Sequence, residues 1–400
     1  MVPGPPPRCP KYQSLDMWRG VACLAVLVFH SSWMPPGTPG LSAAANVVAG
    51  TAAYGWLGVP VFFVISGYCI TAAVDNHRRK PGASLLTYFK RRFRRIYPPY
   101  WIVLVGYLAI VAFFDLVVPG RIMSSHGFNR PWWFSPWQWA GNFSLTEMWR
   151  YHVVGEDAGW MLGNAWTLCY EEQFYFIAGM LLLLTPRRYF EAAAGVTVAV
   201  AVTAVLTARG TLPLEGFFLD GGWLQFAFGI LVYYVRNYAG RAVAMAAAVL
   251  LVAVAIGASW DPRQLLNAQA RNPYLLYFAS SGFAAFLILV HPFDERIANA
   301  RILTPLRYCG QMCYSLYLVH FPVVFFLALL ATLAGLHVSP LVSIPVCSAV
   351  AMAASWQFHL YVERRFLATP VGARGSFRLP SPDLSQVLRR RGRAAVLRDG

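Results

Sequence analysis

The sequence predicts an all-α membrane protein with about ten transmembrane helices, and three observations support this prediction. The 400 residues are 58% hydrophobic and 12% charged, a composition typical of chains embedded in a bilayer. The apolar residues gather into runs of about 20, the length that an α-helix needs to cross the hydrocarbon core. The arginines concentrate in alternate loops between these runs.

The predicted helices follow one another along the chain with mostly short connections. Their ranges are 15–33, 51–73, 97–118, 167–184, 190–208, 217–235, 242–260, 273–291, 311–335 and 340–362. Together they form one membrane domain over residues 15–366. This domain follows a Pro-rich segment, 1–14, and precedes a basic tail, 367–400, which we expect to be flexible and attracted to anionic lipid.

The positive charge predicts how the helices are oriented. It is concentrated in four loops and the tail, and the loops between them are uncharged or balanced. The basic loops are 74–96, 185–189, 236–241 and 292–310. Because basic loops stay in the cytoplasm, both termini are predicted to be cytoplasmic and the protein to lie in the inner (plasma) membrane. This pattern explains the net charge of +16 without any nucleic-acid partner.

Two other features have ordinary interpretations that we favour. The long outer loop, 119–166, is rich in tryptophan and proline. These tryptophans suit the membrane interface, and a stacking platform for a sugar is the alternative. The seven cysteines lie mostly in or beside apolar runs and predict neither a disulfide framework nor a metal site.

The first predicted helix carries ionisable residues that mark it as functional. Charged groups inside a bilayer are costly, and Asp16, Arg19 and His30 all lie in this span. At about 100° per residue, the steps from Arg19 to His30 return to within about 20° of the same face, about 16 Å along the axis. Asp16 lies one turn before Arg19, which predicts an i,i+3 ion pair.

Six motifs in order resemble those of the acyltransferase-3 family, integral membrane O-acyltransferases of bacterial surface glycans and some secreted metabolites. The first is LDMWRGVACLAVLVFH, where Arg19 and His30 match the family's first-helix signature. The others are GVPVFFVISGYCIT (58–71), YFKRRFRRIYPPYW (88–101), WTLCYEEQFY (166–175), CYSLYLVHFPV (313–323) and YVERRF (361–366). The chain departs from the family pattern at Met17-Trp18, Cys169 and Arg365, and none of these changes removes an ionisable group.

The resemblance implies transfer of an acyl group, most simply acetyl, from acyl-coenzyme A to a hydroxyl. Coenzyme A is then a co-substrate, and we expect no bound cofactor and no metal. A hydroxyl needs a base to become nucleophilic, and His30 is the candidate because imidazole titrates near neutral pH. A carboxylate usually orients such a histidine. Glu171 and Glu172 both lie near the outer end of the fourth span. We predict Glu172 for this role, because it matches the second Glu of the family's EEQFY motif.

We expect arginine side chains to bind the phosphates of the donor. Arg19, Arg91, Arg92 and Arg95 match family positions on the cytoplasmic side, although the positive-inside rule alone would explain most of this charge. Three further residues of the predicted spans, His320, Ser66 and Gly67, have less specific signals.

His320 either lines the donor channel or forms a hydrogen bond within the bundle. Ser66 and Gly67 suit helix packing, which we favour over a nucleophilic role for Ser66.

The leading predicted acceptor is a surface or exported polysaccharide or lipopolysaccharide. A macrolide-like metabolite is the enzymatic alternative, so the acceptor is a glycan, a lipid-linked glycan or a small molecule. A transporter of an anionic solute is the rival from another class, because buried charges suit translocation as well. The sequence shows no inverted repeat, which disfavours the transporter. It carries no signal for an oligomeric state.

Overall fold

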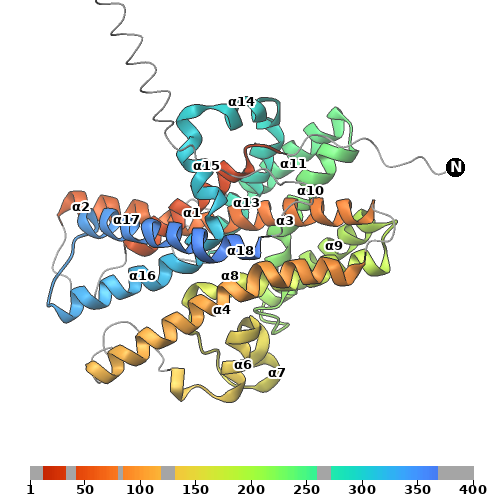
Figure 1. The fold of residues 1–400 in the computed structure, drawn as a ribbon. Coiled ribbons are helices and arrows are strands. Elements are labelled where there is room, and N and C mark those ends of the chain that lie inside the picture. The colour runs from red at the N-terminus through yellow and green to blue at the C-terminus, as the bar shows by residue number, and fades with distance from the viewer. Residues whose placement is uncertain (1–11, 33–41, 80–83, 119–130, 259–271, 368–400) are drawn as a thin grey trace, which may run out of the picture. The chain divides into compact units, whose positions relative to one another are not determined.

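The computed structural model describes residues 12–32, 42–79, 84–118, 131–258 and 272–367. Within these ranges the chain is helical and contains no strand (Figure 1). The all-α prediction is therefore confirmed for the described residues. Most of the predicted Pro-rich segment and nearly all of the predicted basic tail lie outside them.

The principal helices largely follow the apolar runs of the sequence. They are α1 (Leu15–Ser31), α2 (Ala43–Ala52), α3 (Gly58–Arg78), α4 (Leu85–Val117), α6 (Pro136–Ser144), α7 (Glu147–Val154), α8 (Trp166–Leu184), α9 (Tyr189–Ala208), α10 (Gly222–Tyr238), α11 (Arg241–Ala258), α13 (Pro273–Val290), α14 (Asp294–Asn299), α15 (Thr304–Gln311), α16 (Cys313–Leu333), α17 (Pro340–Phe358) and α18 (Arg364–Phe366). Short turns link them: η1 (Ala53–Leu57), η2 (Pro131–Trp133), η3 (Gly163–Ala165), η4 (Phe218–Asp220), η5 (His291–Phe293), η6 (Arg301–Leu303) and the π-helical η7 (His359–Glu363).

Seven helical stretches among the described residues are long and apolar enough to cross a membrane. They are Ala43–Arg78, Leu85–Val117, Tyr189–Ala208, Arg241–Ala258, Pro273–Asn299, Cys313–Leu333 and Pro340–Phe366. Each overlaps one predicted span, which supports a multi-pass membrane protein. The other three predicted spans are the helices α1, α8 and α10, of 17, 19 and 17 residues. The count of ten is thus not confirmed, and the cytoplasmic termini remain a prediction.

Two segments predicted as loops are partly helical. The arginine-rich segment before the third span belongs to α4, which runs for 33 residues from Leu85. Arginine is a good helix former, so a membrane helix can continue past its apolar part. The predicted outer loop contains η2, α6 and α7. Helix α6 begins at a capping box, where Ser135 accepts from the backbone N–H of Gln138 and Gln138 accepts from that of Ser135.

A buried ion pair holds the segment between α4 and α8 together. The Glu147 carboxylate, fully buried, accepts from Arg150 Nε and Nη2 at 2.8 Å each and from the backbone N–H of Gly159 at 2.6 Å. These contacts raise the pKa of Arg150 above its ordinary value. Tyr100 of α4 donates to the carbonyl of Asn142 at 2.8 Å and joins the segment to the core.

Close helix contacts fix the helices that surround the site. A Cβ on Gly67 of α3 would lie 2.1 Å from the carbonyl oxygen of Phe226 in α10. A Cβ on Gly310 of α15 would lie 1.5 Å from the carbonyl oxygen of Asp16 in α1. Neither distance is sterically possible, so glycine allows these two pairs of backbones to approach as small residues do in membrane helices.

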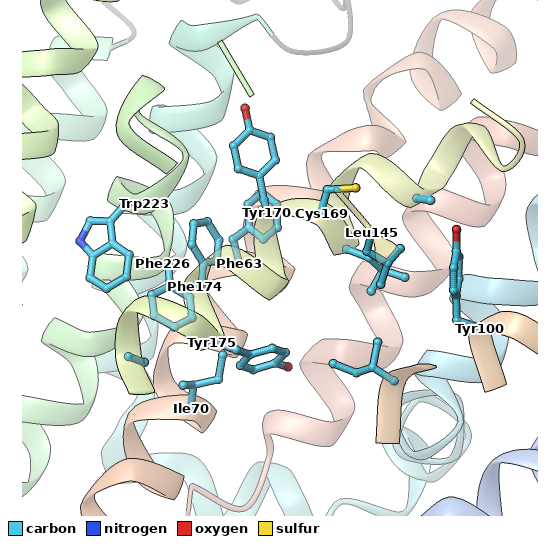
Figure 2. Close-up of a cluster of buried hydrophobic side chains, with 14 of the residues drawn as sticks. Phe63, Ile70, Tyr100, Leu145, Cys169, Tyr170, Phe174, Tyr175, Trp223 and Phe226 are labelled. Carbon is cyan, nitrogen blue, oxygen red and sulfur yellow. The ribbon is translucent and has the colours of Figure 1, made fainter. Parts of the chain in front are cut away.

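Helix α8 lies at the centre of the largest hydrophobic cluster. Figure 2 shows its side chains between α3, α4 and α10, with Phe174 against Phe226 and Phe63 beside Tyr170. Phe174 and Trp223 are fully buried. Because α8 is packed on several sides, its rotation about its own axis is fixed. That rotation decides which of its two neighbouring glutamates faces the site.

Candidate active site

A cavity of about 570 Å³ lies among α1, α3, α4, α8, α10 and α16. Its wall includes both ends of the functional face predicted on α1, since Arg19 and His30 line the same space. They are eleven helical steps apart on one helix, a rise of about 16 Å. The cavity is therefore long enough to bring an extended molecule from the arginine to the histidine.

Arg19 lies in a polar and sulfur-rich part of the wall. Its Nη1 donates to Asp16 Oδ1 at 2.8 Å, the contact that the i,i+3 spacing predicts. Its Nη2 donates to Cys69 Sγ at 2.9 Å. Three cysteines line the cavity, and we refer to Cys23, Cys69 and Cys313 as the cavity cysteines.

The arginines of α4 divide into two groups. Arg92 and Arg95 line the cavity, whereas Arg91 is exposed and is not among the described residues of its wall. Arg92 lies over the ring of Tyr175, 4.7 Å from its centroid, an arrangement that orients the flat guanidinium. The predicted donor group thus separates by geometry, because adjacent residues on a helix point about 100° apart.

Two histidines face each other at the other part of the cavity. The ring centroids of His30, in the last turn of α1, and His320 of α16 are 5.2 Å apart. The Phe321 ring meets His30 edge-on at 5.4 Å. The sequence predicts His320 either at the donor channel or hydrogen-bonded within the bundle, and it does not predict this proximity. No sequence pattern relates the rotation of the first helix to that of the ninth.

The two glutamates of α8 lie on different walls. Glu171 lines the cavity, and its Oε1 accepts from Ser66 Oγ at 2.9 Å and from Tyr175 Oη at 2.7 Å. Glu172 lines a second pocket of about 230 Å³ with Tyr97, whose hydroxyl donates to Glu172 Oε2 at 3.3 Å. This geometry does not support the predicted Glu172–His30 pair, because the packing of α8 turns Glu171 toward the cavity instead.

Polar contacts that the sequence analysis missed join the start of α8 to α16. Asn164 Nδ2 donates to the carbonyl of Tyr317 at 2.7 Å, and the Tyr317 hydroxyl donates to the carbonyl of Asn164 at 2.5 Å. Thr167 Oγ1 donates to the Tyr317 hydroxyl at 2.9 Å. All three residues line the cavity, and Tyr317 lies one turn before His320 on α16. They fix the part of α16 that carries this histidine.

The described residues contain no cluster of three or more histidine, cysteine or acidic side chains that could hold a metal ion. The ionisable groups of the cavity include three arginines, two histidines, the Asp16 carboxylate beside Arg19, and Glu171 with its hydroxyl partners. This arrangement suits an anionic ligand at the arginines and a proton transfer at the histidines.

Comparison with known proteins relates the chain to acyltransferases. Residues 12–360 match the family model described as "Acyltransferase domain". The chain is 24% identical over 336 residues to Peptidoglycan O-acetyltransferase OatA of Listeria monocytogenes, covering 78% of this chain and 49% of that protein. Two further relatives have provisional names. The chain is 28% identical to membrane-bound transacylase BcsY of Komagataeibacter xylinus, covering 78% of this chain and 72% of that protein. It is 24% identical to peptidoglycan O-acetyltransferase YrhL of Bacillus subtilis, covering 78% of this chain and 48% of that protein.

The chain thus spans about half the length of two of these relatives. No solved structure gives a significant match. The family model covers far more than half of the chain, including α1 with its arginine and histidine and α16 with the second histidine. The chain belongs to the acyltransferase-3 family.

Proposed function

We propose that this protein is an O-acyltransferase that moves an acyl group, most simply acetyl, from acyl-coenzyme A to a hydroxyl of a surface or exported glycan at the inner membrane. One observation carries the proposal: a single cavity contains arginines and a histidine that α1 holds about 16 Å apart. An extended donor anchored at the arginines reaches the histidine without leaving the cavity.

The donor site in this proposal consists of Arg19, Arg92 and Arg95. Guanidinium groups bind phosphate through paired hydrogen bonds, so they suit the phosphate-rich head of coenzyme A. Arg95 is exposed while lining the cavity, which gives the head a place at the entrance. Arg91 is left out of the site because it lies outside the cavity wall.

His30 acts as the base in this mechanism. It removes the proton from the acceptor hydroxyl as the oxygen attacks the thioester carbonyl, and a tetrahedral intermediate forms. The carbon–sulfur bond then breaks, and the proton on His30 passes to the leaving coenzyme A thiolate. The products are an ester and the free thiol, and the histidine returns to its neutral form.

The acceptor is proposed to be a glycan because two relatives are named for peptidoglycan O-acetylation. Peptidoglycan is accordingly the first acceptor to test, with exported polysaccharide and lipopolysaccharide next. A macrolide-like metabolite is the alternative acceptor. Transport of an anionic solute is the alternative function, since the arginines would also bind such a solute.

The test uses membranes that contain the parent protein or its His30→Ala variant, with radiolabelled acetyl-coenzyme A. Peptidoglycan, lipopolysaccharide, polysaccharide and lipid fractions are offered separately. We expect label in an alkali-labile ester only with the parent protein, and the labelled fraction identifies the acceptor class. Equal labelling with both proteins would remove His30 from the chemistry. Uptake of solute into vesicles without any new ester would favour the transporter.

A further inference from the structure

We propose that His320 is the positioning residue for His30. It takes the role that a carboxylate usually has beside a catalytic histidine. The inference rests on the proposed function and names the partner of its base. Helices α1 and α16 pack against each other and carry the two rings (Figure 1). The rings are 5.2 Å apart between centroids, and both line the cavity.

The hydrogen bond on one side of the His320 ring fixes its tautomer. Nδ1 lies 2.7 Å from the carbonyl oxygen of Leu316. A carbonyl oxygen only accepts, so Nδ1 carries the proton in this contact. In the neutral ring Nε2 then has a free lone pair and can only accept a hydrogen bond. The backbone of α16 thereby determines what the other nitrogen of His320 can do.

That second nitrogen has no hydrogen-bond partner among the described residues, although His320 is 2% exposed. Leaving a buried polar atom without a partner is unfavourable, and such atoms in native proteins call for an explanation. A histidine that served only to pack α16 would not need a polar atom at this position. The cavity and the neighbouring imidazole provide the explanation, because the His30 ring lies 5.2 Å from the His320 ring between centroids and lines the same cavity.

The two rings form a pair with complementary roles. When a His30 N–H donates to His320 Nε2, the other nitrogen of His30 keeps its lone pair and can take the hydroxyl proton. The same hydrogen bond supports the imidazolium that His30 becomes. Catalytic hydrogen bonds are often long without substrate and shorten when it binds. A neutral partner also avoids a buried negative charge, which is costly inside a membrane.

Two substitutions separate this role from a packing role. His320→Asn keeps a donor where Nδ1 stands and can preserve the bond to Leu316, but it lacks the acceptor of Nε2. His320→Gln places an amide oxygen near Nε2 and lacks the Nδ1 donor. The matched control is His337→Asn, which changes an exposed histidine outside the cavity.

The experiment measures acetyl transfer from radiolabelled acetyl-coenzyme A to solubilised peptidoglycan fragments by the full-length protein in membranes. If the parent is inactive on peptidoglycan, the acceptor fraction labelled in the preceding test replaces it. Turnover is expressed per binding site for tritiated coenzyme A, so only folded protein is counted. We expect kcat to fall about 100-fold or more for His320→Asn with KM for acetyl-coenzyme A changed less than threefold. His320→Gln should retain at least a tenth of the parent turnover, and His337→Asn should match the parent.

Each other outcome has a definite meaning. If His320→Asn turns over at more than a third of the parent rate, or if His320→Gln is the worse of the two, His320 is structural and the inference fails. A tenfold rise in KM with unchanged kcat would assign His320 to donor binding instead. In all these cases His30-dependent transfer by the parent still supports the proposed function. If no acceptor fraction is labelled by the parent, the proposed function fails and the inference fails with it.

Discussion

The neighbouring arginines of α4 provide the sharpest test of donor binding. Arg92 lines the cavity over the ring of Tyr175, whereas Arg91 is exposed and outside the cavity wall. Both carry the same charge and differ by one position on the same helix. If the arginines bind coenzyme A through direct contacts, Arg92→Gln should weaken donor binding and Arg91→Gln should not. If their charge acts only through membrane topology, the two substitutions should behave alike.

The expected magnitude follows from the contacts that are lost. One hydrogen bond to a charged group is worth about 1.5–3 kcal/mol, and each 1.4 kcal/mol changes a binding constant about tenfold. Glutamine fills most of the same space but cannot bind phosphate as a charged fork. We therefore expect Arg92→Gln to raise the dissociation constant and KM of acetyl-coenzyme A about 10- to 100-fold. Arg91→Gln should change them less than twofold.

The assay combines direct binding of tritiated coenzyme A with acetyl transfer, because KM equals the dissociation constant only when the chemical step is slow. Raising the salt concentration should weaken donor binding by the parent and by Arg91→Gln to a similar extent. Equal losses in the two variants would refute a specific role for Arg92. So would a loss of kcat with unchanged donor binding, which would place the effect of Arg92 on the chemical step.

Three further predictions concern the walls of the cavity and the segment before α8. Glu171→Gln should lower kcat/KM about 30-fold, because each of the two hydroxyl hydrogen bonds to its carboxylate weakens by about 1 kcal/mol. Glu172→Gln should change kcat/KM less than threefold, and the reverse order in a transfer assay would contradict the structure. Glu147→Gln should destabilise the protein by about 3 kcal/mol, since the buried Arg150 then keeps only a longer ion pair, 3.6 Å, to the partly exposed Glu156. Thermal unfolding in detergent should show little change for Glu156→Gln. Acetyl-coenzyme A should slow the labelling of the cavity cysteines by N-ethylmaleimide in mass spectra and leave the other described cysteines unaffected; no protection would place the donor elsewhere.

The sequence predicts well those features that lie within one helix. The face shared by Asp16, Arg19 and His30 follows from helical periodicity, and the structure contains the Asp16–Arg19 hydrogen bond. The overlap of seven predicted spans with long apolar helices follows from the hydrophobic runs. In both cases the determining interactions are local, so one stretch of sequence contains the necessary information.

Features that depend on how helices pack are not predicted. The choice of Glu172 over Glu171 depends on the rotation of α8, which is fixed by core contacts with α3, α4 and α10. The proximity of His30 and His320 joins residues 290 positions apart in the chain. Helices α6 and α7 are stabilised by a buried ion pair and a capping box, and their tryptophan-rich sequence gives little periodic signal.

The placement of Arg19 and His30 on one helix has a mechanical consequence. A short α-helix is stiff, so the distance between Arg19, in its second turn, and His30, in its last turn, hardly changes when neighbouring helices move. Tilting of α4, α8 or α16 can widen or narrow the cavity, admit either substrate and release the products. The distance between Arg19 and His30 along the helix stays at about 16 Å throughout. In the proposed mechanism, α1 therefore sets the length of the donor that can reach from the arginine to the histidine.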